Sequence, residues 1–225
     1  TIIDWQDDHR FLKTAFDVSV FADIARQEIQ FGYLKRPTAR NTEQDKAKFE
    51  VCNHKYTDLS ETRYGVSILN DCKYGISVKD SRMHLSLHKG GVRPDWTGDH
   101  GKHRCTYVFH PHRGGFGAEQ VIKPAYELNY PVLTADTAAA KPSFVRVDAD
   151  NVVIETVKPC EDAQRAYILR MYEAEGCHCR AALIFRDSNV KLYATDMLEE
   201  NAVPCDTTLS FRPLEIKTIK VVYGE

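Results

Sequence analysis

The sequence contains no hydrophobic run long enough to cross a membrane. Its longest apolar stretches, such as 181–185, are far shorter than the roughly 18 residues that a membrane-spanning helix requires. Residues 1–13 carry acidic side chains where a secretory signal peptide would place basic residues and then an apolar stretch. We therefore expect neither a membrane span nor secretion.

An excess of charge of one sign is also missing. The chain has 30 Lys and Arg against 32 Asp and Glu, and it contains no block of like charges that would attract a phosphate backbone. Nucleic acid is therefore a poor first expectation for a partner. With 225 residues, 43% of them hydrophobic, the chain has the composition of a globular protein with one large domain or two ordinary ones.

The cysteines and glycosylation sequences give an expectation about the cellular compartment. Seven cysteines are an odd number, in a chain too long to depend on disulfides for stability, and no Asn-x-Ser/Thr sequence occurs. Both observations favour the reducing environment of the cytoplasm. Because the sequence opens at Thr1 without an initiator methionine, we also expect it to be part of a longer chain.

Short runs of alternating apolar residues predict that most of the chain forms β-strands. One run places Ile29, Phe31 and Tyr33 on one face of a strand. No strand is followed by the dozen or so residues of helical crossover that a parallel pair requires, so we expect antiparallel sheets. The other expected strands lie at 66–68, 76–78, 83–87, 105–109, 152–157, 167–172, 181–185, 190–193, 207–211 and 214–223.

Helix is expected only as short turns. The one segment of helical length, 118–128, contains Pro124, which removes a backbone donor and should break or kink the helix. An alanine-rich stretch without periodicity, 135–142, reads as a connector. The expected fold is therefore all-β, with a larger domain at 1–145 and a small β-sandwich at 146–225.

The first candidate functional segment is 70–75, Asn-Asp-Cys-Lys-Tyr-Gly, between two expected strands. Asn and Asp tolerate turn geometry, so 69–75 reads as a simple hairpin connection. The same tip presents an amide at Asn70, a carboxylate at Asp71 and an ammonium group at Lys73, which can hydrogen-bond the hydroxyl groups of a polar ligand. The residue types leave both interpretations open.

Trp96 is the second candidate, in a long loop rich in turn-forming residues. An exposed Trp on a β scaffold can stack on the apolar C–H face of a sugar ring, and it can equally cover the core. The sequence has no glycine-rich phosphate loop, no Gly-x-Ser-x-Gly and no His-Glu-x-x-His. Its acidic residues form no pattern that identifies a general acid and its partner.

Histidines and cysteines form a third candidate group. The sequences His110-Pro-His112 and Cys177-His-Cys179 each place two potential zinc ligands on one face of an extended strand. Neither has the two-residue spacer of a zinc knuckle or ribbon, and Cys105 falls on an apolar strand face, so a solvated His-rich loop and buried thiols are the other interpretation. The full group is His100, His103, Cys105, His110, His112, Cys177, His178 and Cys179.

Several strings resemble, in order and spacing, the C-terminal half of glycoside hydrolase family 38, the α-mannosidases. The most specific are 69–75, Leu-Asn-Asp-Cys-Lys-Tyr-Gly, and 58–61, Asp-Leu-Ser-Glu. The resemblance covers nearly the whole chain and looks closest to the cytosolic and bacterial branch. Further matching strings lie at 28–32, 36–38, 48–50, 64–66, 85–87, 153–158, 170–174 and 212–216.

The resemblance implies a retaining α-mannosidase whose zinc ion and nucleophilic Asp lie on an N-terminal α/β barrel outside this chain. No His-x-Asp triplet of the family's zinc motif occurs here. The implied fold is a supersandwich resembling that of galactose mutarotase, followed by the small terminal β domain. The implied partners are the barrel and mannose-containing glycans, and the chain would hold no cofactor. Asn70, Asp71, Lys73 and Tyr74 would lie at the rim of the sugar site.

We therefore predict a non-catalytic β region that packs on the barrel. Retaining hydrolysis needs a nucleophile and an acid about 5 Å apart, both supplied elsewhere, so the chain alone should hydrolyse nothing. An apolar patch near the 70–75 loop is expected where the barrel docks, and it can also drive homo-oligomer formation. The alternatives are a stand-alone carbohydrate-binding module that uses Trp96 and a small zinc protein.

Overall fold

The chain forms two compact units, Thr1–Val132 and Leu133–Glu225, in a computed structural model that describes residues 1–134, 136, 143–161 and 163–224. Each unit has its own apolar core. The connector expected at 135–142 lies, apart from Asp136, outside the described residues. The sequence-based boundary at residue 145 stays a prediction.

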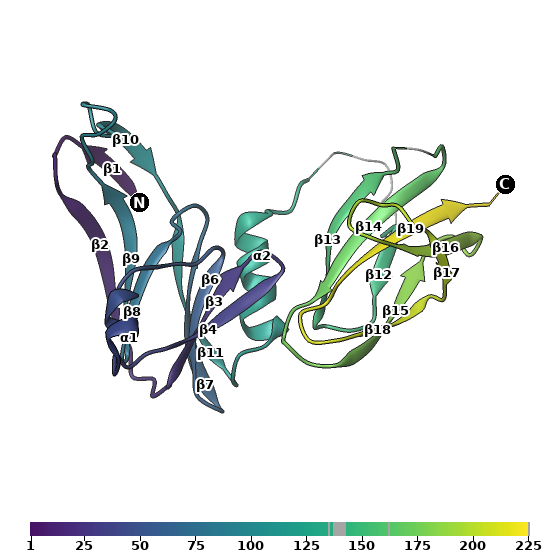
Figure 1. The fold of residues 1–225 in the computed structure, drawn as a ribbon, viewed down its shortest axis with the longest axis horizontal. Helices are drawn as coiled ribbons and strands as arrows, with labels where there is room; N and C mark the ends of the chain where they lie inside the picture. The colour runs from purple at the N-terminus through teal and green to yellow at the C-terminus, as the bar shows by residue number, and fades with distance from the viewer. Residues whose placement is uncertain (135, 137–142, 162, 225) are drawn as a thin grey trace. The chain divides into compact units, whose positions relative to one another are not determined.

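The first unit is built from antiparallel sheets (Figure 1). A five-stranded sheet has the order β11 (Tyr107–Arg113), β7 (Tyr64–Asn70), β6 (Tyr56–Ser60), β3 (Ile24–Ile29) and β4 (Gly32–Pro37). A four-stranded sheet has the order β2 (Phe11–Asp17), β9 (Arg82–Lys89), β8 (Gly75–Lys79) and β5 (Val51–Cys52). The remaining pair is β1 (Ile2–Trp5) with β10 (Gly101–Arg104).

The core of the first unit comes from the alternation that the sequence shows. In β9, Met83, Leu85 and Leu87 are buried, and the residues between them are less so. They share a core with Leu59 and Ile68 of the five-stranded sheet, both fully buried. Strand period two thus puts the apolar faces of both sheets into one cluster.

The predicted continuous strand through Ile29, Phe31 and Tyr33 is wrong. The chain turns between β3 and β4, where Ile29 pairs with Gly32. Phe31 has a φ of +57°, the left-handed conformation that a tight turn requires, and so it cannot continue the strand. Because apolar residues keep the alternating spacing across the turn, the sequence pattern does not reveal it.

A helical segment covers the five-stranded sheet despite Pro124. The π-helix η1 (Ala118–Ile122) runs directly into α2 (Lys123–Asn129), and both contact strands of that sheet (Figure 1). Pro124 stands in the first turn of α2, where its missing N–H is tolerated, so the predicted break does not occur. Because Pro124 has no N–H, it cannot donate to the carbonyl of Gln120, four residues earlier. That carbonyl oxygen instead lies 2.9 Å from His110 Nε2.

The third helix, α1 (Glu43–Ala47), is a single short element before β5. Thr42 and Asp45 form a reciprocal capping box at its N-terminus. The side chain of each residue accepts from the backbone N–H of the other, and these N–H groups have no acceptor within the helix. None of the helices in the described part of the chain is long and apolar enough to span a membrane.

The second unit is also entirely antiparallel. Its core is formed by Leu169, Met171 and Ile219 of the larger sheet with Leu183 and Phe211 of the smaller one. The all-β antiparallel prediction is therefore confirmed. One sheet has the order β13 (Val152–Pro159), β14 (Ala166–Glu173), β19 (Ile216–Tyr223), β16 (Val190–Thr195) and β17 (Val203–Cys205), and the other β12 (Val145–Val147), β15 (Cys179–Phe185) and β18 (Thr208–Phe211).

Candidate functional site

The 70–75 segment connects two different sheets. It leaves β7 of the five-stranded sheet and enters β8 of the four-stranded sheet, so it is not the hairpin connection that turn composition suggested. Turn residues predict that a chain changes direction, but they do not say which strand it pairs with next. The segment therefore lies where the chain crosses from one layer of the first unit to the other.

Asn70 holds this crossing in place with all of its polar groups. Its side-chain Nδ2 donates to the carbonyl of His54 at 2.6 Å, and its Oδ1 accepts from the Lys73 amide at 2.7 Å. Its backbone amide donates to Lys55 O at 3.0 Å, and its carbonyl accepts from Asn129 Nδ2 at 3.1 Å. Because Asn70 is fully buried, its role in this structure is to position the loop.

Asp71 anchors the loop to the segment before β11. Both carboxylate oxygens accept from the Thr106 amide at 3.0 Å. Burial alone would raise the pKa of Asp71, but hydrogen bonds from the Cys72 thiol and the Thr106 amide outweigh it and hold the pKa below its usual 3.8. Burial and the adjacent Asp71 raise the pKa of Cys72 to about 11, so this thiol is a poor nucleophile at neutral pH.

Besides the exposed Cys72, the loop presents the side chains of Lys73 and Tyr74. Lys73 is half-buried and has no ion-pair partner among the described residues. Tyr74 is 50% exposed, and its ring lies edge-on to His54 with 5.0 Å between centroids. The Tyr74 carbonyl accepts from the Asn53 amide at 2.9 Å, which fixes the end of the loop. The Lys73 ammonium group and the Tyr74 ring are thus carried by a loop whose backbone is fixed by hydrogen bonds.

Trp96 lies in a separate loop, between β9 and β10. Its side chain is 72% exposed, so it does not cover the core. The Arg93 guanidinium lies 5.4 Å from the ring centroid, within the range of a cation–π contact. No ring contact or hydrogen bond joins Trp96 to the 70–75 loop within the described ranges.

The histidines and cysteines do not converge. His100 Nε2 lies 2.9 Å from Asp8 Oδ1, and His103 Nε2 lies 2.7 Å from the carbonyl of Asp99. Cys105 is buried in the core of the first unit, where its thiol packs as a small apolar side chain, as its place on an apolar strand face indicated. Among the residues that the structure describes, no group of three or more His, Cys, Asp or Glu side chains is arranged to hold a metal ion.

A buried polar network that sequence reasoning missed lies between β6, β7 and β11. The fully buried carboxylate of Asp58 accepts from Ser60, from Ser67 Oγ at 2.8 Å and from His112 Nε2 at 3.0 Å. Gly65 makes room for the imidazole, because a Cβ there would stand 2.4 Å from His112 Cε1. Asp58 and Ser60 are two residues apart on a mostly buried strand and so share one face. This spacing is the feature of the sequence from which a buried polar network could have been predicted.

A second buried carboxylate organises one end of the second unit. Glu173 Oε1 accepts from Asn151 Nδ2 and from the Glu175 amide, both at 2.9 Å. Its Oε2 accepts from the amides of Gly176, Cys177 and Leu214 at 2.8–3.0 Å. Asn151 Nδ2 also lies 3.2 Å from Cys177 Sγ, so this thiol, a candidate zinc ligand by sequence, belongs to the loop network around Glu173.

Two family models match the chain. Residues 1–97 match "Glycosyl hydrolases family 38 C-terminal domain", and residues 151–219 match "Glycosyl hydrolases family 38 C-terminal beta sandwich domain". The first match lies in the unit that carries the 70–75 loop, and the second lies in the unit organised around Glu173.

Similar curated proteins are much longer than this chain. "Alpha-mannosidase 2C1" of Homo sapiens is 45% identical over 184 residues, which cover 79% of this chain and 18% of that protein. "Alpha-mannosidase G" of Dictyostelium discoideum is 34% identical over 239 residues, covering 99% of this chain and 22% of the relative. The chain therefore spans about a fifth of the length of these relatives.

Solved structures share the fold. An alpha-mannosidase from Enterococcus faecalis V583 superposes with a TM-score of 0.81 at 15% identity, over 97% of this chain and 26% of that one. A glycosyl hydrolase family 38 protein from Enterococcus faecalis gives 0.77 at 17% identity, over 97% of this chain and 27% of that one. At such identities the likeness concerns the arrangement of the strands.

Proposed function

Because the chain belongs to glycoside hydrolase family 38, as the C-terminal β region of its α-mannosidases, we propose that it is the non-catalytic scaffold of a longer enzyme. That enzyme hydrolyses terminal α-D-mannosides of glycans with retention of configuration. Its nucleophile, its acid and its zinc ion belong to a catalytic barrel that precedes this region. The described residues offer no set of side chains that fits zinc, so no step of the reaction is assigned to a metal held here.

The observation that carries the proposal is the construction of the 70–75 loop. Buried Asn70 and the bidentate Asp71 fix its backbone, while Lys73 and Tyr74 keep their side chains available. Side chains on a fixed backbone lose little further freedom when they contact a ligand. We assign Lys73 and Tyr74 to the rim of the sugar site, and Asn70 and Asp71 to positioning them.

Contact with the barrel is assigned to exposed apolar side chains of the first unit. Tyr74 in the loop is 50% exposed, Phe21 before β3 is 84% exposed, and Ile24, the first residue of β3, is 39% exposed. Phe21 and Ile24 line one open hollow together with Arg26 and Glu61. The hollow and Tyr74 lie at opposite ends of β7, and exposed apolar side chains at either place can contact the barrel or a second copy of the chain.

Removing the rim side chains should weaken substrate binding in the longer enzyme. We expect Lys73→Ala and Tyr74→Ala each to raise KM about tenfold, the effect of losing one hydrogen bond to a charged or aromatic group. Steady-state hydrolysis of an aryl α-mannoside and of mannobiose measures the effect. Lys79→Ala, which removes an exposed ammonium group at the end of β8, is the matched control. An unchanged KM in both loop variants would place the sugar elsewhere.

The carbohydrate-binding alternative depends on Trp96, which is 72% exposed in a turn-rich loop. Calorimetric titration of the isolated chain with mannose and mannobiose separates the two functions. The scaffold proposal expects no heat of binding, whereas millimolar or tighter binding that Trp96→Ala abolishes would favour the module.

We assign the protein to the cytoplasm because of its seven cysteines and lack of glycosylation sequences.

A further inference from the structure

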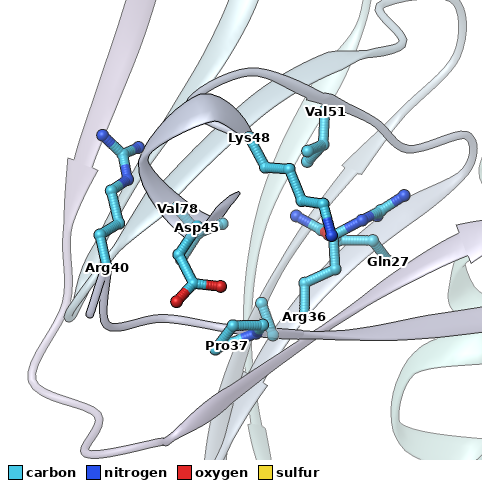
Figure 2. Close-up of a pocket in the computed structure, with 9 residues that line it drawn as sticks. Gln27, Arg36, Pro37, Arg40, Asp45, Lys48, Val51 and Val78 are labelled. Atoms are coloured by element: carbon cyan, nitrogen blue, oxygen red, sulfur yellow. The ribbon is translucent and has the colours of Figure 1, made fainter. Parts of the chain in front are cut away.

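A small cavity lies in the first unit between strands of both sheets and α1 (Figure 2). Its wall includes Gln27 and Arg36 of the five-stranded sheet, Val51 of the four-stranded sheet, and Asp45 and Lys48 at α1. The volume is about 30 Å³. One ordered water needs roughly 10–15 Å³ on this measure, so the space suits a group with about two oxygen atoms and excludes a sugar ring.

Most of the polar side chains that line this space are hydrogen-bond donors. Gln27 is 1% exposed, and its Oε1 accepts from Arg36 Nη1 at 2.5 Å. Because a guanidinium has only donors, the amide oxygen must be the atom that faces Arg36. The Nε2 end of Gln27 therefore keeps its hydrogens, and it has no hydrogen-bond partner among the described residues.

The wall carries three cationic side chains, Arg36, Arg40 and Lys48, and one carboxylate, Asp45. Neither Arg36 nor Lys48 is in an ion pair with any residue that the structure describes. Lys48, the C-cap residue of α1, lines the same cavity as Gln27 and Arg36 (Figure 2). Asp45 is the carboxylate of the wall, and its Oδ2 already accepts from Thr42 N at 3.0 Å and Thr42 Oγ1 at 2.7 Å.

We propose that this cavity is a binding site for one small carboxylate anion. Arg36 Nη1 already donates to Gln27 Oε1 and, at 3.2 Å, to the Cys52 carbonyl, so the donors left without a partner among the described residues are chiefly the Lys48 ammonium and the Gln27 Nε2 group. The single carboxylate of Asp45 does not balance the cations of the wall, and a second anion would reduce their repulsion. The two oxygens of a carboxylate match the volume of the cavity, and one oxygen for Lys48 and one for Gln27 Nε2 match the two donors that the described residues leave without a partner. The anion is either a free small carboxylate or the side chain of an Asp or Glu from elsewhere in the longer protein.

Titration of the ¹⁵N-labelled chain with sodium acetate, at constant pH and ionic strength, tests the site. We expect a saturable shift of the Gln27 side-chain amide resonance with a millimolar midpoint. Lys48→Gln should weaken binding at least about tenfold, the loss of one charge-assisted hydrogen bond, and Lys48→Arg should restore it. Lys46→Gln is the matched control, since Lys46 has the same charge on α1 but pairs with Glu43.

A second titration with N-acetyl-aspartate methylamide distinguishes the two sources of the carboxylate. Comparable binding of this compound supports a protein side chain as the occupant, and binding of acetate alone supports a free anion. The proposal is overturned if the Gln27 resonance does not shift, or if the shifts do not saturate. It is also overturned if Lys48→Gln and Lys46→Gln behave alike.

Discussion

The Glu173→Ala variant is expected to lose about 4 kcal/mol of the unfolding free energy of the second unit. That loss is a large share of the total, because the unfolding free energy of a domain is roughly 0.1 kcal/mol per residue. The reason is that four backbone amides and Asn151 Nδ2 donate to one buried carboxylate, and all lose their acceptor together. The loops that hold Gly176 and Leu214 should open first.

The two units can be followed separately in this experiment. Both tryptophans, Trp5 and Trp96, lie in the first unit, so tryptophan fluorescence reports that unit while hydrogen exchange at residues 175–177 reports the second. Glu200→Ala is the control, because it removes an exposed carboxylate of the same unit. Equal stability of the two variants would mean that Glu173 does not organise these loops.

The same carboxylate gives the second unit a pH dependence of known sign. Burial alone would raise the pKa of Glu173, but hydrogen bonds from the Leu214 and Glu175 amides and Asn151 outweigh it and place the pKa below its usual 4.5. A lowered pKa contributes stability above the unfolded value, and this is lost as pH falls toward the folded value. Glu173→Gln should be less stable at neutral pH and lose less on acidification.

Asp58→Ala should have a comparable effect on the first unit, about 3–5 kcal/mol, because it leaves His112 and Ser67 buried without their acceptor. Denaturant unfolding followed by tryptophan fluorescence measures it. Asp17→Ala is the control: it removes a carboxylate that pairs with Arg82 on the exposed face of β2 and β9, and exposed pairs contribute little.

A double-mutant cycle adds a sharper test of the same network. If Asp58 acts through the imidazole, then Asp58→Ala should cost clearly less in a His112→Phe background than in the native chain. Full additivity of the two losses would contradict the hydrogen bond between Asp58 and His112 as a source of stability.

Strand alternation was enough to predict much of the fold. In β9, three core residues alternate with polar ones, and the structure buries all three. The pattern failed at Phe31, where the chain turns with a positive φ while apolar residues keep the same spacing. It also failed at Pro124, because the sequence shows that a donor is missing but not that the proline stands in the first turn of a helix.

The site was less accessible to prediction than the fold. Local composition identified the segment around Asn70, and the resemblance to family 38 is confirmed by two family models. The partners of Asn70 and Asp71 are His54, Thr106 and Asn129, which are distant in sequence and are brought close by sheet topology. Short-range patterns do not contain such contacts, so the positioning of the loop had to come from the structure.

The two buried carboxylates and the fixed loop agree with a scaffold role. Asp58 and Glu173 are saturated with donors, which holds loops and strands in place but leaves neither oxygen pair free to act on a substrate. A catalytic carboxylate must reach the reacting atoms, and a retaining pair must face each other about 5 Å apart.

The most direct test of the scaffold role is the rate of hydrolysis of 4-nitrophenyl α-D-mannoside by the 225-residue chain alone, with a longer enzyme that includes it as the positive control. We predict a rate equal to the no-protein blank for the chain and a clear rate for the longer enzyme. Hydrolysis by the chain alone that scales with its concentration and persists through further purification would contradict the account.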